Sequence, residues 1–114
     1  MSATTDVIDT QVAAFRDRDL ERFMATYSDD AVIRDFRGTV MMASPVVMRE
    51  MYAQLFTGSP DLKVDVPNRI EVGDYVVDEE HLSGFNMAGY PSEMTALVTY
   101  WVRDGKISEV VIAA

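Results

Sequence analysis

The segment Met94-Thr-Ala-Leu-Val-Thr-Tyr-Trp-Val-Arg-Asp-Gly-Lys-Ile-Ser-Glu-Val-Val-Ile-Ala113 decides the fold. Two stretches with strand character, 94–103 and 106–113, are separated only by Asp104-Gly105. Asp-Gly between two strand patterns is among the better short-range signals for a β-hairpin. The C-terminal part of the chain is therefore predicted to end in an antiparallel pair of strands.

More strand-like segments precede this hairpin, and turn residues divide them. Residues 62–66 and 69–72 are predicted as two short strands, with a break at Pro67. Gly73-Asp74 makes a tight turn into a longer strand that covers 75–85. The second half of the chain is thus predicted to be almost entirely β-structure.

The first half is predicted to be mainly helical. Apolar residues recur at three- and four-residue spacing after Thr4 or Thr5, either of which would cap an amphipathic first helix. Asp19 is predicted as the N-cap of a short second helix, and a strand follows at 31–36. Ser44-Pro45, a capping hydroxyl followed by proline, begins a third helix.

Three helices followed by a run of antiparallel strands is the element order of an α+β domain. In such domains the helices pack on one face of a curled sheet. The chain has 114 residues, of which 48% are hydrophobic, and no internal repeat or linker. Residues 1–114 are therefore predicted to form one domain with a core of its own.

Composition narrows the range of partners. The net charge of −9 argues against nucleic acid or an anionic membrane, because phosphate binding needs an excess of lysine and arginine. The chain has no cysteine, which excludes disulfides and thiolate zinc sites and favours a reducing compartment. Neither a signal peptide nor a membrane span of about 18 apolar residues is seen. We expect a cytoplasmic protein.

The chain resembles the nuclear-transport-factor-2-like (NTF2-like) superfamily, the fold of ketosteroid isomerase, scytalone dehydratase and the SnoaL-type polyketide cyclases. The best segments are 18–32, 68–78 and 101–107. The resemblance implies a cystatin-like cone, with N-terminal helices packed in the concave face of a strongly curved antiparallel or mixed sheet. It leaves the activity open, because the superfamily includes isomerases, dehydratases, cyclases, hydrolases and non-catalytic binders.

Asp35 is the first candidate for catalysis. A carboxylate on a strand that helices cover is either a desolvated proton acceptor or the partner of a nearby arginine such as Arg34 or Arg37. The general base of ketosteroid isomerase is an aspartate on the first strand after an Asp-Asp-Ala segment, and the resemblance puts Asp35 at that position. It puts Gln11 and Thr99 at the two oxyanion-binding positions, as weaker acids than the residues they replace.

A dense polar cluster occurs at 78–81, Asp-Glu-Glu-His. Side chains alternate along a strand, so Asp78 and Glu80 share one face and His81 lies on the other. Two carboxylates on an inward face would make an acid–base pair or hold a polar substrate, whereas mid-strand charges also line solvated faces. A metal site needs three or four convergent ligands, and with one histidine neither metal nor cofactor is predicted.

The strand at 94–103 is apolar on both faces. If Thr99 faces a cavity, Trp101 stands at its wall, and the opposite face carries Val98, Tyr100 and Val102. A sheet that is apolar on both faces needs a second cover, and a second copy of the chain would supply it. A homodimer through the outer sheet face is also what the resemblance implies.

The predicted function is binding of a small hydrophobic molecule in an apolar conical pocket. The enzymatic hypothesis is a cofactor-free isomerase, dehydratase or cyclase that acts on a hydrophobic carbonyl or polyketide-like metabolite. In it Asp35 is the base, with Gln11 and Thr99 as oxyanion or orienting donors. Two alternatives stay open: a non-catalytic ligand-binding or dimerisation module, and a protein-interaction adaptor. The predicted ligand-binding residues are Phe15, Tyr27, Tyr52, Asp78, Glu80, Trp101, Val110 and Ile112.

Overall fold

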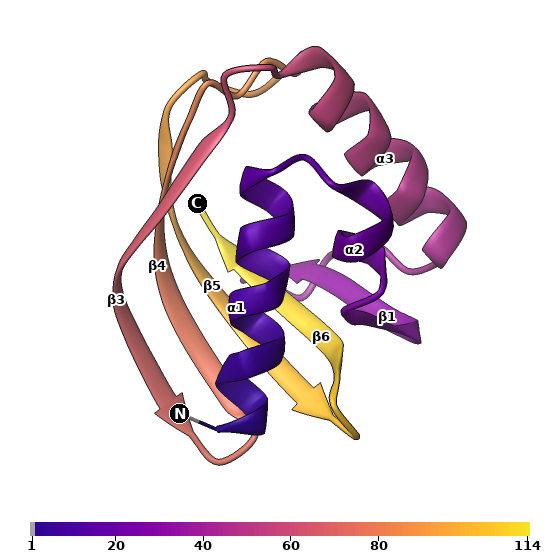
Figure 1. Ribbon diagram of the computed structural model, residues 1–114, viewed down its shortest axis with the longest axis vertical. Helices are drawn as coiled ribbons and strands as arrows, with labels where there is room; N and C mark the ends of the chain where they lie inside the picture. Colours follow the sequence, from indigo (N-terminus) through magenta and orange to yellow (C-terminus); the bar gives the residue numbers. More distant parts are fainter. Residues whose placement is uncertain (1) are drawn as a thin grey trace.

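A computed structural model describes residues 2–114, which form helices packed against a single curved sheet (Figure 1). The helices are α1 (Ala3–Arg16), α2 (Leu20–Met24) and α3 (Pro45–Gly58), and the strands are β1 (Tyr27–Asp35), β2 (Val40–Met42), β3 (Lys63–Val72), β4 (Tyr75–Ser83), β5 (Met94–Arg103) and β6 (Lys106–Ala113). The strands β3 to β6 bend around α1, and α3 closes the opposite side (Figure 1). This is the predicted α+β cone.

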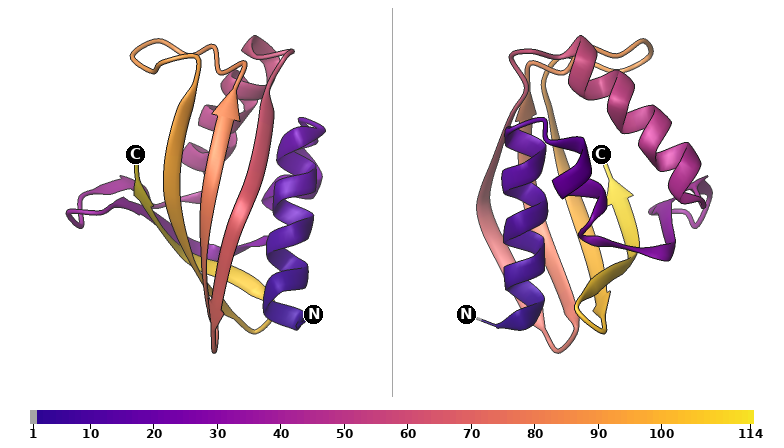
Figure 2. Two further views of the ribbon diagram at one scale, coloured as in Figure 1. Left: turned by 90° about the vertical axis from the view of Figure 1, so that its left-hand side faces the viewer. Right: turned by 45° about the vertical axis from the view of Figure 1, so that its right-hand side comes forward.

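The sheet is mixed, in the order β2-β1-β6-β5-β4-β3. Every neighbouring pair is antiparallel except β1 and β6, which run parallel with Arg34 opposite Val111. The two further views show β1 and β2 turning away from the long strands β3 to β5 (Figure 2). The twist leaves a concave inner face, and α1 and α3 cover it.

The helices begin at polar caps, as the sequence pattern indicates. Asp19 caps α2 and Ser44 caps α3, both as predicted. The predicted first cap, Thr4 or Thr5, is wrong, because Ser2 caps α1 instead. Thr5 is the third residue of that helix, where its hydroxyl accepts a hydrogen bond from the Ser2 backbone N–H while the Ser2 hydroxyl accepts from the Thr5 N–H.

Turn chemistry explains the strand boundaries. Asp104 and Gly105 have φ angles of 54° and 76°, the left-handed geometry of a two-residue hairpin turn, so the predicted hairpin is confirmed. The predicted break at Pro67 is wrong, since β3 continues through it with a shift of register between Asp65 and Asn68. A bulge accommodates the missing proline N–H without ending the strand.

An aromatic cluster joins the helices to β1. Phe23 is fully buried, and its ring centroid lies 4.5 Å from that of Tyr52 and 5.2 Å from that of Tyr27. Phe15 and Phe56 also pack on Phe23, with centroids at 6.1 and 5.6 Å. Rings from α1, α2, α3 and β1 therefore fix one another, and with them the positions of two tyrosines that line the cavity.

No helix within residues 2–114 is long and apolar enough to cross a membrane.

Candidate functional site

A cavity of about 400 Å³ lies between the helices and the concave face of the sheet. This volume is within the range of about 300–1,000 Å³ typical of small-molecule pockets. Its walls are mostly aliphatic, aromatic and methionine side chains. Seven of the residues predicted for the site line it: Gln11, Phe15, Tyr27, Tyr52, Glu80, Val110 and Ile112.

Four of the polar side chains that line the cavity form one hydrogen-bonded chain. Gln11, from α1, donates its amide N–H to the Tyr27 hydroxyl oxygen at 3.1 Å. The Tyr100 hydroxyl, from β5, donates to Oε2 of Glu80 at 2.7 Å, and the same hydroxyl lies 3.5 Å from Oε1 of Gln11. Four elements of the cone, α1, β1, β4 and β5, therefore bring an amide, two phenols and a carboxyl group together in apolar surroundings.

Glu80 is the acidic side chain of this hydrogen-bonded chain. Its side chain is buried on the inner face of β4, with 9% of the residue exposed. Burial raises the pKa of Glu80 to about 7, and the nearby Asp78 carboxylate also raises it. The Tyr100 hydrogen bond and the Arg69 charge act in the opposite direction. Near neutral pH this carboxyl group can therefore both accept and release a proton.

Burial has the matching effect on the tyrosines. Loss of solvent is the largest cause that raises the pKa of Tyr27, Tyr52 and Tyr100 above the ordinary phenol value. The charge of Glu80 raises all three further. The three hydroxyls therefore keep their hydrogens at neutral pH and can act as hydrogen-bond donors.

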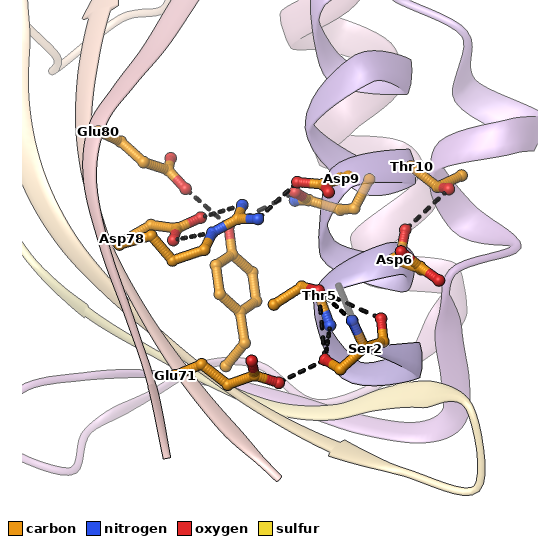
Figure 3. Close-up of polar contacts among 11 residues, drawn as sticks. Ser2, Thr5, Asp6, Asp9, Thr10, Glu71, Asp78 and Glu80 are labelled. Atoms are coloured by element: carbon orange, nitrogen blue, oxygen red, sulfur yellow. Dashed lines mark hydrogen bonds and ion pairs between the residues drawn. The ribbon is translucent and has the colours of Figure 1, made fainter. Parts of the chain in front are cut away.

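Asp78 lies two residues before Glu80 on the same face and has a different environment. It is fully buried and receives two hydrogen bonds from Arg69, Nε to Oδ1 at 2.6 Å and Nη2 to Oδ2 at 2.9 Å. The third guanidinium nitrogen binds Asp9 of α1. Figure 3 shows Asp78 and Glu80 side by side and the contacts that extend across to Asp9. Arg69 thus ties β3 and β4 to α1.

The predicted shared face of Asp78 and Glu80 is confirmed, but only Glu80 lines the cavity. Asp78 is not among the lining residues; it is fully buried, and Arg69 binds both of its oxygens. His81 is on the outward face, where its ring contacts Glu79. Within residues 2–114, no group of three or more His, Asp or Glu side chains is arranged to hold a metal ion.

Asp35 does not lie where the base was expected. Its Oδ1 accepts hydrogen bonds from the backbone N–H groups of Arg37 and Thr39, both at 2.9 Å. The carboxylate thereby caps the turn between β1 and β2, and it is not among the groups that line the cavity. Pairing with Arg34 is also wrong, because Arg34 binds Glu109 at 2.9 Å.

Thr99 and Trp101 lie on the outer face of β5, so their predicted place in the cavity is wrong. The inward residues are those assigned to the outer face: Val98, Tyr100 and Val102 are 5%, 2% and 4% exposed. Strand alternation then turns Thr99 and Trp101 outward. The predicted convergence of Thr99 with Asp35 and Gln11 therefore does not occur.

Tyr100 is the site residue that the sequence analysis missed. Both faces of β5 are rich in apolar residues, so alternation alone does not tell which one points inward. The polar hydroxyl of Thr99 is a signal that favours the correct choice. The inward set contains Tyr100 with two valines, whereas the outward set includes Thr99.

Comparisons with known proteins agree with this architecture. The sequence profile of the SnoaL-like domain family matches residues 8–110. An uncharacterized cystatin-fold protein from Novosphingobium aromaticivorans superposes with a TM-score of 0.87 at 24% identity, covering 100% of this chain and 99% of that one. TerC, co-crystallised with polyporic acid, gives 0.78 at 21% identity, covering 98% and 91%. A candidate polyketide cyclase from Sinorhizobium meliloti gives 0.74 at 17% identity, covering 99% and 100%. No curated protein matches the chain significantly.

Proposed function

The chain belongs to the SnoaL-like domain family of the NTF2-like superfamily, and we propose that it is a cofactor-free enzyme that moves a proton on an apolar carbonyl compound. The observation that carries this proposal is Glu80, an acidic side chain with a pKa of about 7 at the wall of a mostly apolar cavity. A base poised near the working pH is what proton transfer requires. In this proposal Glu80 takes the role that the resemblance to ketosteroid isomerase gave to Asp35.

The reaction begins with ionised Glu80 taking a proton from a carbon next to the carbonyl group of the ligand. The electron pair of the broken C–H bond forms the C=C bond of an enolate, and the carbonyl π pair moves to the oxygen. Protonated Glu80 then returns the proton to another carbon of the conjugated system, which completes an isomerisation. Dehydration and aldol cyclisation start from the same enolate.

Tyr100 and Gln11 support this step through hydrogen bonds around Glu80. When Glu80 is ionised, the Tyr100 hydroxyl donates to its Oε2 at 2.7 Å. Once Glu80 carries the proton, Tyr100 can turn its hydrogen toward Oε1 of Gln11 at 3.5 Å. Both protonation states of Glu80 therefore have a hydrogen-bond arrangement available, which suits a group that must gain and lose a proton repeatedly.

The structural neighbours support an apolar, oxygen-bearing ligand. TerC was crystallised with polyporic acid, and the Sinorhizobium protein is named for polyketide cyclisation. Compounds of these kinds combine apolar rings with carbonyl or hydroxyl groups. The cavity of this chain offers the same balance, since six polar side chains face walls that are otherwise mainly aliphatic, aromatic and methionine.

The test uses 2-tetralone, a small apolar ketone with acidic hydrogens beside its carbonyl group. Proton NMR in deuterated buffer measures how fast these hydrogens exchange with solvent. Wild-type protein is expected to accelerate the exchange, and Glu80→Gln, which keeps the size and removes the base, is expected to abolish the acceleration. Glu79→Gln, on the outward face of the same strand, is the matched control and should keep it. Equal acceleration by Glu80→Gln contradicts the proposal, and so does an inactive wild type.

We also propose that the chain forms a homodimer through the outer face of the sheet. Ile70, Val72 and Leu97 are more than half exposed there, beside the partly buried Trp101. Their burial against a second copy would remove a large apolar surface from water. Light scattering coupled to gel filtration is expected to give the mass of a dimer, and Leu97→Glu to give that of a monomer. A monomeric wild type contradicts this proposal.

A further inference from the structure

Three polar atoms at the cavity wall have hydrogen-bonding capacity that the protein leaves unused. Within residues 2–114, Oε1 of Glu80 has no hydrogen-bond partner, because Tyr100 binds the other oxygen. The Tyr52 hydroxyl contacts no donor or acceptor in the same part of the chain. The Tyr27 hydroxyl accepts a hydrogen bond but donates none. No fully buried side-chain nitrogen or oxygen in residues 2–114 lacks a hydrogen-bond partner, so the unpaired atoms here are open to the cavity, where a ligand can reach them.

Tyr52 is held rigidly although its hydroxyl is unpaired. It comes from α3, and its ring packs between Phe23, at a centroid distance of 4.5 Å, and Phe56, at 6.0 Å. A fixed ring leaves the hydroxyl one main freedom, rotation of its hydrogen. Tyr52 also lines the cavity, so the rigid hydroxyl forms part of the cavity wall and is available as a donor.

Gln11 orients the Tyr27 hydroxyl so that it can donate a hydrogen bond. The Gln11 amide N–H occupies an acceptor position of the Tyr27 hydroxyl at 3.1 Å, and the hydrogen of that hydroxyl is left without a protein acceptor. A phenol that accepts one hydrogen bond becomes a stronger donor in another. Tyr27 comes from β1, its ring packs on Phe23 at a centroid distance of 5.2 Å, and it lines the same cavity.

These three atoms define a complementary ligand. Two hydroxyl hydrogens require an oxygen that accepts, and Glu80 Oε1 requires an acidic hydrogen on the same molecule. We propose that Tyr52 and Tyr27 donate hydrogen bonds to the oxygen of an enolisable carbonyl compound or a phenol while Oε1 of Glu80 takes its proton. The ligand's developing negative charge then lies on an oxygen that faces donors.

This inference rests on the proposed function and replaces the predicted oxyanion site. The resemblance put the donors at Gln11 and Thr99, but Thr99 lies on the outer face and Gln11 acts through Tyr27. The donors therefore come from β1 and α3. A carboxylic acid is a poor alternative ligand, because its charge would meet the Glu80 carboxylate in a site with little solvent.

Binding of 2-naphthol compared with naphthalene tests the inference. The two probes share one apolar ring system and differ by a hydroxyl group, and the fluorescence of the ring reports binding of both. Wild-type protein is expected to prefer 2-naphthol. Tyr52→Phe and Tyr27→Phe should each reduce that preference about threefold to tenfold, the usual effect of one lost hydrogen bond. Naphthalene binding should stay at the wild-type level in both variants and thereby report intact folding.

Tyr75→Phe is the matched control, since its ring stacks on Trp101 at the outer face of the sheet. This variant should keep the wild-type preference. The inference is overturned if both cavity variants also keep it. The exchange of 2-tetralone separates the two proposals. If exchange depends on Glu80 but neither tyrosine variant changes the preference for 2-naphthol, only the proposal that the tyrosines are donors is wrong. If the wild-type protein does not accelerate exchange but the tyrosine variants do reduce the preference for 2-naphthol, only the proposed enzymatic function is wrong.

Discussion

Asp78 and Glu80 occupy the same face of β4, two residues apart, and their surroundings differ. Arg69 donates hydrogen bonds to both oxygens of Asp78 and to Asp9 of α1. Glu80 has a single hydrogen bond, from the neutral Tyr100 hydroxyl, and an apolar cavity in front of it. Asp78 therefore links β4 to β3 and α1 through Arg69, whereas Glu80 faces the cavity.

The difference shows that the partner, rather than the depth of burial, decides what a buried carboxylate does. Asp78 is the more deeply buried of the two, at 0% exposure against 9%. Asp78 has a bidentate arginine as its partner, whereas Glu80 has a phenol hydrogen bond that offsets its loss of solvent only in part. The consequence for Glu80 is a pKa of about 7.

Removal of Arg69 is expected to have the largest effect on stability. Arg69→Met leaves Asp78 buried without its counter-charge, which typically costs about 3–5 kcal/mol of unfolding free energy. Urea denaturation at neutral pH measures the loss. Arg34→Met is the control, because the pair of Arg34 with Glu109 has side chains that are each 36% exposed and should contribute about 1 kcal/mol or less. Equal losses in the two variants would show that Asp78 does not depend on its arginine.

The pH dependence of stability tests Glu80. Its carboxyl group has a pKa of about 7 in the folded protein and an ordinary value of 4.5, so the folded state binds the extra proton between these pH values. The stabilisation from Glu80 is complete below pH 4.5 and is lost as pH rises through 7, by about 3 kcal/mol in total.

Glu80→Gln removes this loss. The free energy of unfolding of the variant, compared with wild type, is therefore expected to rise by about 3 kcal/mol between pH 4.5 and pH 8. Urea denaturation of both proteins across this range gives the difference at each pH. Glu79→Gln should show no such gain, since the pKa of Glu79 is lowered by hydrogen bonds from Asn68 and His81. A difference between Glu80→Gln and wild type that is independent of pH contradicts the assignment.

Tyr100→Phe should move the pH profile of activity. The Tyr100 hydrogen bond stabilises ionised Glu80, so its loss raises the pKa of Glu80 further, by about one pH unit for a hydrogen bond to a charged group. The midpoint of 2-tetralone exchange against pH is expected to shift upward by this amount, with the plateau still reached at higher pH. An unchanged midpoint would mean that Tyr100 does not tune Glu80.

The smallest effect is expected at Asp35. Asparagine also accepts backbone hydrogen bonds in turns, so Asp35→Asn should change stability by no more than about 0.5 kcal/mol. Exchange of 2-tetralone should proceed at the wild-type rate. A large loss of exchange would restore Asp35 as a base and would end the contrast between Glu80 and the other carboxylates.

The sequence predicted the fold well because its signals are local. Asp19, Ser44 and Asp104-Gly105 each determine their helix start or turn through their own side chains or backbone, and the structure agrees with all three. Alternation along β4 correctly put Asp78 and Glu80 on one face. The three-residue strand β2 was not predicted, since it forms only by pairing with β1.

The site was harder to predict, because it depends on distant contacts. Asp35 follows the family pattern in sequence, yet its carboxylate accepts hydrogen bonds from backbone N–H groups two and four residues later, in the turn that follows β1. The inward direction of Tyr100 depends on how β5 pairs with its neighbours across the sheet. Arg69 binds Asp78 but not Glu80, and this contact joins β3, β4 and α1. Because the partners are far apart in the chain, no local sequence pattern predicts it.

Titration of the Glu80 side chain by NMR tests the account most directly. Carboxyl carbons are labelled with ¹³C in all glutamates, and the Glu80 signal is identified as the one missing from Glu80→Gln. We predict that this signal titrates with a midpoint near pH 7. A midpoint at or below the ordinary value of 4.5 would contradict the central claim that this carboxyl group is poised for proton transfer.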